Sequence, residues 1–335
     1  MTGRLVASDN AGGGCDAIAR EIIEGRRLTR ADDLAFLLEA PLEHLGSAAN
    51  EIRRACVGEH VDLCAILAAR SGRCSEDCAF CAQSGRHKTD CDVHGMMAVD
   101  EIVAVSREIE NAEVNRFALV TSGKRMSGKD FKQALEAYRQ MRSATRLNLC
   151  ASMGLLAREQ LEQLHDAGVT RYHCNIETSR HFFPQICTTH AFDEKIATIR
   201  AAQKAGLEVC SGGIIGMGET REDRVDMALA LAELDVRSIP LNVLSAIPGT
   251  PLEKLEPLPE DEVLRAAAIF RFINPEAHIR LAGGRSLLSG WGERVFSYGA
   301  SATITGNMLT TTSSSVEVDR QMLDKLGRDT SPDWK

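Results

Sequence analysis

The sequence predicts an α/β protein, a (β/α)8 barrel of the TIM type with an N-terminal helical extension. Three observations predict this fold class: eight strand-like runs alternate with helical patterns, no internal boundary interrupts them after residue 60, and an unusually long connection follows the first run. Strands that alternate with helices form parallel βαβ units, and eight such units close a barrel. We expect an extension over residues 1–60, the barrel over 61–328 and a tail over 329–335.

Hydrophobic periodicity and turn residues place the elements in order. Residues 1–14 are polar and Gly-rich and are expected to be disordered, with helical spacing from Asp16 onward. Two further short helices are expected over residues 29–38 and 46–57. The strand-like runs are 61–68, 116–122, 146–153, 171–178, 208–216, 238–246, 278–283 and 302–306. The helical patterns of the barrel are 99–110, 129–141, 157–167, 192–205, 221–234, 260–272 and 286–298.

Composition excludes several classes of function. The net charge of −8 argues against nucleic-acid binding, which depends on neutralising phosphates. Apolar runs of about 18 residues are absent, so we expect no membrane span. The polar start has no apolar signal region, which favours a cytoplasmic protein. In such a compartment the 11 cysteines are expected to be metal ligands or free thiols rather than disulfides.

Three cysteines lie close together in the long connection after the first strand. Cys74, Cys78 and Cys81 are separated by three and two residues, so three thiolates can converge on one iron–sulfur cluster. A fourth thiolate is missing from this loop, which leaves one iron open to a non-protein ligand. A zinc site with His87 or a disulfide pair is the alternative, but no second Cys or His pair follows that would complete a zinc site. The loop follows a strand and is therefore expected at the C-terminal mouth of the barrel, where active sites lie.

The predicted strands carry sulfur and charge where a barrel interior is ordinarily filled by Val, Ile and Leu. Cys64, Cys150 and Cys210 lie on the first, third and fifth strands, and Arg280 lies on the seventh among apolar neighbours. A single buried cysteine is commonly just a small apolar residue. Three cysteines and an arginine at equivalent depth instead indicate a second iron–sulfur cluster inside the barrel.

The fourth strand carries a row of polar residues. His173, Asn175 and Glu177 alternate with Cys174 and Ile176, so the three polar side chains share one face. The alternative is that Ile176 faces inward, but the outer face of a barrel strand packs against helices and should be apolar. We therefore expect the polar row to line the interior.

A glycine-rich turn follows the fifth strand. Its glycines allow the backbone to approach a ligand closely, and Glu219 and Thr220 open the helix that follows. The free N–H groups at a helix N-terminus bind polar groups. A turn needed only for packing is the alternative, and the order of a dinucleotide-binding GxGxxG motif is absent. We expect Glu219 at the cofactor.

The cysteine run of the long connection resembles the signature of radical-SAM proteins. Taken with the other motifs, the chain resembles the biotin synthases, a family of radical-SAM sulfur-insertion enzymes, from about residue 62 to about residue 328. The motifs that carry this resemblance are 71–84, 172–179, 186–190, 209–220, 239–242, 249–252, 279–285 and 309–311.

This resemblance implies roles for individual residues. Cys74, Cys78 and Cys81 would hold a 4Fe-4S cluster that binds S-adenosylmethionine (SAM). The remaining implied roles are SAM binding by Asn175, Glu177 and Lys195, substrate binding by His173 and Asn242, and ligation of an auxiliary 2Fe-2S cluster by Cys150, Cys210 and Arg280.

The sequence departs from the family at the fourth auxiliary ligand. Ala118 stands where the family has a cysteine, and alanine cannot bind iron. Cys64, on the adjacent strand, is our candidate replacement, and an auxiliary cluster of a four-iron type is the other expectation. Cys174 is expected to face away from the interior, Cys187 is expected to be structural, and Cys91 has no evident partner.

By this resemblance the substrate is dethiobiotin, the electron donor is flavodoxin- or ferredoxin-like, and the chain forms a homodimer. Two alternatives stay open at this point. One is another radical-SAM barrel enzyme, such as a methylornithine-synthase-like mutase or a hydrogenase-maturation-like enzyme, which the missing thiolate at Ala118 favours. The other is a non-catalytic iron–sulfur or zinc protein, against which the polar row of the fourth strand argues.

Overall fold

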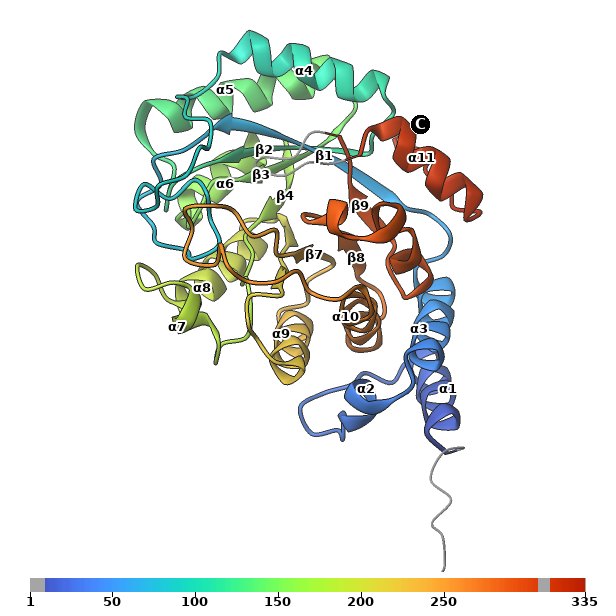
Figure 1. Cartoon of the computed structure of the whole chain (residues 1–335). Coiled ribbons are helices and arrows are strands. Elements are labelled where there is room, and N and C mark those ends of the chain that lie inside the picture. The colour runs from blue at the N-terminus through green and yellow to red at the C-terminus, as the bar shows by residue number, and fades with distance from the viewer. Residues whose placement is uncertain (1–9, 307–313, 335) are drawn as a thin grey trace, which may run out of the picture.

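A computed structural model describes residues 10–306 and 314–334, so the expected disorder of residues 1–9 and the motif at 309–311 lie outside the described residues (Figure 1). All strand pairs are parallel, in the order β5-β4-β3-β2-β1-β9-β8-β7-β6, and β5 also pairs with β7. The short strands β5 and β6 follow each other along the same side of β7 and together fill one position of the sheet. The sheet therefore closes as a barrel of eight positions, which confirms the predicted fold class. The strands are β1 (Asp62–Arg70), β2 (Arg116–Thr121), β3 (Asn148–Ser152), β4 (Val169–His173), β5 (Glu208–Cys210), β6 (Gly213–Ile215), β7 (Ser238–Val243), β8 (His278–Leu281) and β9 (Ala302–Ile304).

Helices surround the strands, and within the described residues three more precede the barrel (Figure 1). The barrel helices are α4 (Val99–Asn111), α5 (Gly128–Ala144), α6 (Arg158–Asp166), α7 (Phe183–Ile186), α8 (Phe192–Lys204), α9 (Arg221–Glu233), α10 (Glu260–Ile273) and α11 (Val316–Lys325). The preceding helices are α1 (Asn10–Ile23), α2 (Ala35–Glu39) and α3 (Leu42–Cys56). Among the described residues no helix is long and apolar enough to cross a membrane.

Two strand predictions were wrong in extent. The expected strand over 208–216 is broken into β5 and β6, where a Cβ on Gly212 would lie 2.0 Å from the carbonyl oxygen of Pro240. Pro240 on β7 has no N–H for the ladder, so pairing lapses at this point. The expected strand over 171–178 is β4 (Val169–His173), and beyond it Glu177, with a left-handed backbone (φ 70°), makes only an isolated bridge with Gly213.

Three helix predictions also need correction. Helix α1 begins at Asn10 and not at Asp16, and the helix expected over 29–38 is only α2 (Ala35–Glu39). The expected helix over 286–298 is two short 3₁₀ segments, η1 (Arg285–Leu287) and η2 (Ser289–Ser297). Left-handed backbone angles at residues 290–292 interrupt the second segment, and glycine at two of these three positions allows them. Helices α7 and α11 were not predicted.

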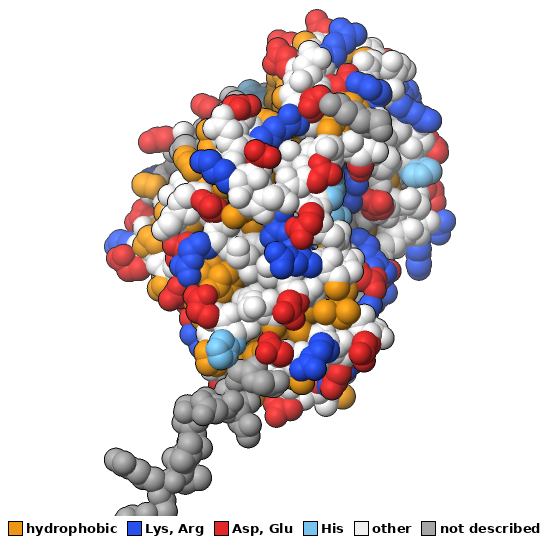
Figure 2. All heavy atoms as spheres, turned by 90° about the vertical axis from the view of Figure 1, so that its right-hand side faces the viewer, with side chains coloured by type: hydrophobic (Ala, Val, Ile, Leu, Met, Phe, Trp, Pro, Cys, Tyr) orange, Lys and Arg blue, Asp and Glu red, His pale blue; other side chains and the backbone are white. Residues whose placement is uncertain are grey.

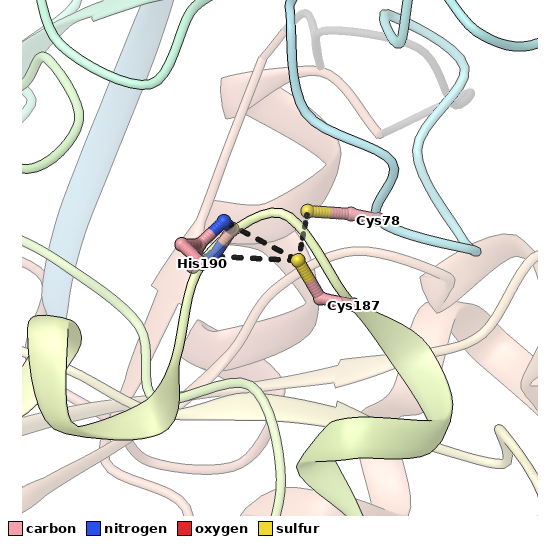
Figure 3. A group of neighbouring side chains, drawn as sticks. All are labelled: Cys78, Cys187 and His190. Atoms are coloured by element: carbon pink, nitrogen blue, oxygen red, sulfur yellow. Dashed lines mark hydrogen bonds between the residues drawn. The ribbon is translucent and has the colours of Figure 1, made fainter.

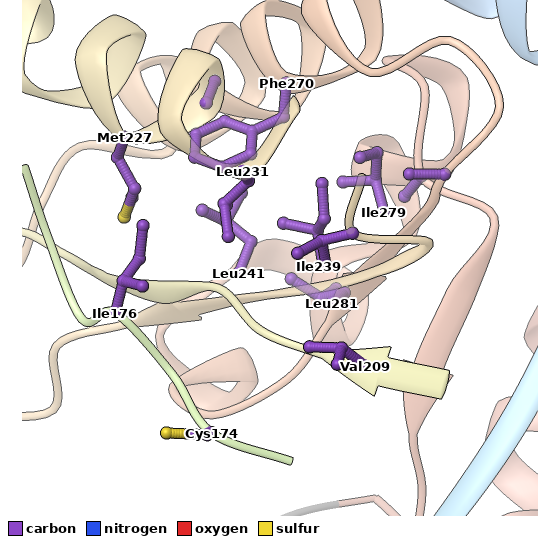
Figure 4. Close-up of a cluster of buried hydrophobic side chains, with 14 of the residues drawn as sticks. Cys174, Ile176, Val209, Met227, Leu231, Ile239, Leu241, Phe270, Ile279 and Leu281 are labelled. Carbon is purple, nitrogen blue, oxygen red and sulfur yellow. The ribbon is translucent and has the colours of Figure 1, made fainter. Parts of the chain in front are cut away.

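The main core lies between the barrel and the helices. Figure 4 shows Ile176, Ile239 and Leu241 of the barrel wall facing Met227 of α9 and Phe270 of α10. All five side chains are buried. Burial of such a side chain contributes about 1.5–3 kcal/mol, so this layer holds the barrel wall rigid around its interior.

The N-terminal helices dock on α10. Arg265 of α10 donates to the carbonyl oxygens of Leu37 and Ala40, at 3.1 and 2.9 Å. A Cβ on Gly46 of α3 would lie 2.3 Å from Cε1 of Tyr298, so this contact requires glycine. The structure therefore joins the extension to the barrel by specific contacts, while the division at residue 60 stays a prediction. Figure 2 shows basic and acidic side chains interspersed on the face that includes this region.

A buried ion pair fixes α11 against the barrel. The Arg285 guanidinium donates to both carboxylate oxygens of Asp319, at 2.5 and 3.0 Å, and both side chains are at most 1% exposed. Ser314 also donates to Asp319, at 2.6 Å.

We expect Asp319→Ala to lower the free energy of unfolding by about 3–5 kcal/mol, because it leaves the Arg285 guanidinium buried without a counter-charge. Urea denaturation of the anaerobic apoprotein measures the change. The matched control is Asp324→Ala, an exposed carboxylate on the same helix, for which we expect a change within about 0.5 kcal/mol. Equal effects of the two substitutions would contradict a structural role for the pair.

Candidate active site

The strand ends and the loops that follow them enclose a cavity of about 420 Å³. Eleven of the thirteen residues predicted for the site line this one cavity, although they come from distant parts of the sequence. They are Cys64, Cys74, Cys78, Cys81, Cys150, His173, Asn175, Glu177, Cys210, Asn242 and Arg280. Lys195 and Glu219 do not line it.

The loop with Cys74, Cys78 and Cys81 forms the mouth of the cavity. Backbone hydrogen bonds fold it back on itself: Cys74 N–H donates to Gln83 O at 2.9 Å, and Cys81 N–H donates to Cys78 O at 2.9 Å. Left-handed residues at Gly72 and Arg73 turn the chain into this loop. Three half-buried thiols on one wall fit a cluster with three protein ligands.

Two thiols meet on the opposite, inner wall. Cys64, Ala118 and Cys150 form a small buried group, in which Ala118 on β2 is in register with Cys150 on β3. Cys64 on β1 and Cys150 on β3 flank β2, and the small Ala118 side chain between them leaves the two thiols facing the same space. Burial raises the pKa of the Cys64 thiol to about 12, so the thiol is protonated at neutral pH.

The third inner thiol has a different environment. Burial alone would raise the pKa of Cys210, but His173 and Arg280 lower it to about 6. Ser238 donates a hydrogen bond to its sulfur at 3.3 Å. Three thiols and a guanidinium around one space are a donor set that fits an iron–sulfur group.

Asp62 lies beneath these thiols and binds three arginines. Its Oδ2 accepts from Arg280 at 2.7 Å, from Arg116 at 3.0 Å and from Arg171 at 3.4 Å. Burial would raise the pKa of Asp62, but the three guanidinium groups, chiefly that of Arg280, hold it well below its usual range. The carboxylate is therefore ionised and joins β1, β2, β4 and β8 at the base of the cavity.

Arg280 is held firmly at this point. Besides Asp62 Oδ2, it donates to the carbonyl oxygens of Asp62 and Thr303, both at 2.9 Å. Burial would lower its pKa, but Asp62 raises it above the ordinary value for arginine. The charged guanidinium lines the cavity with its orientation fixed from below.

The polar row of the fourth strand faces the cavity. His173, Asn175 and Glu177 line it, whereas Cys174 and Ile176 belong to the core outside the barrel wall (Figure 4). The Asn175 amide donates to Glu177 Oε2 at 3.3 Å and accepts from Gly212 N–H at 3.0 Å. The left-handed backbone at Glu177, rare for a residue with a side chain, directs its carboxylate to this position.

Lys195 does not line the cavity but pairs with Glu177 of this row. Its ammonium lies 3.7 Å from Glu177 Oε1, and both side chains are 14% exposed. Burial would lower the pKa of Lys195, but Glu177 raises it above its ordinary value, so the ammonium is charged at neutral pH. Asn242, on the far side, is fixed between Gly213 O and Gly283 N–H at 3.0 and 2.9 Å.

Glu219 lies in the glycine-rich turn and not on the cavity wall, and its contact with the cofactor stays a prediction. Its carboxylate accepts from the N–H groups of Gly216 and Met217, at 2.8 and 2.7 Å, and from Arg224 at 2.8 Å. These bonds close the glycine-rich turn and use the side chain structurally. Sequence reasoning also missed Asp62 and Arg171. The signal that could have found them is an acidic residue at the start of one strand, together with arginines near the starts of other strands of the barrel.

Comparison with known proteins agrees with this geometry. The model of the Radical SAM superfamily matches residues 70–231, and that of the Biotin and Thiamin Synthesis associated domain matches residues 240–329. The fold and the three-cysteine mouth thus define a radical-SAM barrel protein. More particularly, the chain belongs to the biotin synthase family.

Two relatives and one solved structure illustrate the match. The biotin synthase of Alkaliphilus metalliredigens is 50% identical over 310 residues, which cover 92% of this chain and 98% of that protein. The biotin synthase of Clostridium beijerinckii is 51% identical over 312 residues, 93% of this chain and 99% of the relative. The crystal structure of methylornithine synthase, at 19% identity, covers 93% of this chain and 97% of its own with a TM-score of 0.80, and shows the shared fold alone.

We expect Asp62→Asn to lower the free energy of unfolding by about 3–5 kcal/mol, because three guanidinium groups lose their common buried counter-charge. Urea denaturation of the apoprotein measures this. Glu208→Gln is the control, since this 55% exposed carboxylate also pairs with Arg171 and should cost less than about 1 kcal/mol. A small effect of Asp62→Asn would show that the arginines do not depend on it.

Proposed function

We propose that this protein is a radical-SAM sulfurtransferase that converts dethiobiotin to biotin. One observation carries the proposal: the mouth thiols, which suit a radical-generating cluster, and the inner thiols, which suit a sulfur source, line one cavity of about 420 Å³. A volume in the range of about 300–1,000 Å³ is typical of small-molecule sites. Identity of about half the residues to biotin synthases over most of the chain supports the same function.

In this proposal Cys74, Cys78 and Cys81 hold a 4Fe-4S cluster, and an auxiliary cluster is held by Cys150, Cys210, Arg280 and Cys64 in place of the absent thiolate at Ala118. When bound, these groups and SAM supply a 5′-deoxyadenosyl radical at the mouth and sulfide at the inner wall. The auxiliary cluster is of the 2Fe-2S type or a four-iron variant.

The protein's own task is to bind and orient. Glu177 and Asn175 offer a charged and an amide oxygen to the cationic, hydroxyl-bearing cofactor SAM, and Lys195 keeps the Glu177 carboxylate in place. His173 and Asn242 offer polar atoms to the ureido ring of dethiobiotin. Both are fixed on the barrel wall, so a bound substrate has one orientation relative to the two thiol groups.

The cavity must also exclude water. Apolar side chains make up much of its wall between the polar groups, among them Ile66, Phe80, Val120 and Ile304. A reactive carbon radical survives only where solvent and stray hydrogen donors are kept away. We further propose a cytoplasmic homodimer that receives its electron from a flavodoxin- or ferredoxin-like protein.

The decisive experiment is an anaerobic reaction of the reconstituted protein with dethiobiotin, SAM and a reductant. We expect both 5′-deoxyadenosine and biotin. If deoxyadenosine forms without biotin while the auxiliary cluster is intact, the sulfur-insertion function is wrong and a mutase-type reaction takes its place.

For the replacement ligand, we expect Cys64→Ser to retain SAM cleavage but to lose the absorption and Mössbauer signals of the auxiliary cluster. Cys174→Ser is the matched control, because Cys174 is equally buried but packs in the outer core. It should retain both clusters. An unchanged auxiliary spectrum in Cys64→Ser would remove Cys64 from the ligand set.

For SAM binding, we expect Glu177→Gln to weaken the affinity by about tenfold or more, since a charge-assisted hydrogen bond contributes about 1.5–3 kcal/mol. Equilibrium binding to the anaerobic 4Fe-4S protein measures it. Glu233→Gln, on the exposed face of α9, should leave the affinity unchanged. Equal affinities of the wild type and Glu177→Gln would place SAM elsewhere.

A further inference from the structure

A second group of metal-binding side chains lies directly behind the cysteine loop. Cys78, Cys187 and His190 offer two sulfurs and an imidazole whose donor atoms all lie within 4.8 Å of one another (Figure 3). The two sulfurs are 3.9 Å apart, and the Cys187 sulfur lies 3.3 Å from Nδ1 and 3.7 Å from Nε2 of His190. The proposed function uses only Cys78 of these three.

The three residues are brought together by fixed contacts between two distant segments. The Asp77 carboxylate accepts from the N–H groups of Thr188 and Thr189, at 2.9 and 3.2 Å. Ala79 N–H donates to Ile186 O at 2.8 Å. These bonds attach the cysteine loop to the segment after α7, so the arrangement does not rely on mobile side chains alone.

His190 is oriented as metal-binding histidines are. Glu76 Oε2 accepts a hydrogen bond from His190 Nδ1 at 2.7 Å, and both side chains are less than 10% exposed. A carboxylate on one ring nitrogen fixes the tautomer and leaves the other nitrogen, Nε2, free to bind a metal. No other feature of the sequence explains why the Glu76–His190 pair is buried beside two thiols.

The distances match one face of a tetrahedral site. With metal–sulfur bonds of about 2.3 Å and metal–nitrogen bonds of about 2.0 Å, the sulfur–sulfur edge is about 3.8 Å and the sulfur–nitrogen edge about 3.5 Å. The Cys78–Cys187 sulfur separation of 3.9 Å and the 3.7 Å from the Cys187 sulfur to His190 Nε2 lie within a few tenths of an ångström of these edges, and the imidazole donor lies within 4.8 Å of the Cys78 sulfur.

We propose that Cys78, Cys187 and His190 bind one divalent transition-metal ion of the Zn²⁺ or Fe²⁺ type when the chain lacks its cluster, with water as the fourth ligand. Each thiol releases its proton to solvent on binding, no atom is oxidised or reduced, and two thiolates neutralise the ion. Asp77 lies 3.3 Å from the Cys187 sulfur, but its negative charge is already engaged by Thr188 and Thr189.

This site shares Cys78 with the proposed 4Fe-4S cluster, so the ion and the cluster exclude each other. The ion would hold the loop in shape before cluster assembly, and a tightly bound Zn²⁺ would delay assembly. Only this competition rests on the proposed function; binding of the ion to the cluster-free chain does not.

The test uses the full-length, metal-free chain under anaerobic, reducing conditions, titrated with Co²⁺. Tetrahedral Co²⁺ with two thiolates gives intense visible bands and sulfur-to-cobalt charge transfer. We expect one such ion per chain in the wild type and in the double variant Cys74→Ser/Cys81→Ser. We expect the spectrum to be lost in Cys187→Ser and the affinity to fall about 10–100-fold in Glu76→Gln, because the Glu76 carboxylate orients the imidazole of His190.

Two results would overturn the site. One is an unchanged cobalt spectrum in Cys187→Ser; the other is its loss in Cys74→Ser/Cys81→Ser, which would assign the ion to the three loop cysteines. Cys91→Ser, a cysteine of the same long connection, is the matched control and should bind Co²⁺ as the wild type does. Circular dichroism of each variant shows that the chain is folded.

Competition is measured separately, by the rate of 4Fe-4S reconstitution after preloading with one Zn²⁺. We expect Zn²⁺ to slow the wild type several-fold and to leave Cys187→Ser unaffected. Equal slowing of both would contradict the shared role of Cys78. Failure of dethiobiotin conversion in the activity assay would leave the cobalt result standing, so the two proposals fail independently.

Discussion

The carboxylate of Asp62 is the constraint on which the interior of this barrel depends. One buried negative charge holds three guanidinium groups from three other strands, so the base of the cavity carries a net positive charge. A positive base stabilises thiolates above it, and Arg280 contributes to the low pKa of Cys210. The same ion network thus joins the strands and gives the inner wall of the cavity a positive charge.

Polar side chains around the cavity are fixed in pairs with backbone groups rather than left free. Asn175 binds Gly212 N–H, and Asn242 binds both Gly213 O and Gly283 N–H. Because the glycines lie where strands end, each amide also closes a strand end of the barrel. Rigid polar groups lose little conformational entropy when a ligand binds, which suits a reaction that needs one orientation at two carbons.

Local patterns were enough to predict the barrel, the cysteine mouth and the inward face of the fourth strand, because alternation and cysteine spacing are properties of short segments. The features that were not predicted depend on contacts between distant segments. The break between β5 and β6 depends on Pro240 of a neighbouring strand, and the structural use of Glu219 depends on Arg224 and on turn geometry. Asp62 and the group around Cys187 were missed since their partners lie about 50 to over 200 residues away along the chain.

The bonds from Asp77 to Thr188 and Thr189 can form only late in the synthesis of the protein. They span 111 and 112 residues, so the cysteine loop leaves the ribosome long before the segment that anchors it. At synthesis rates of about 5–20 residues per second, the three cysteines wait several seconds or more without that anchor. The nascent chain therefore exposes these thiols during translation. We expect iron and sulfide to be delivered after residue 190 has left the ribosome.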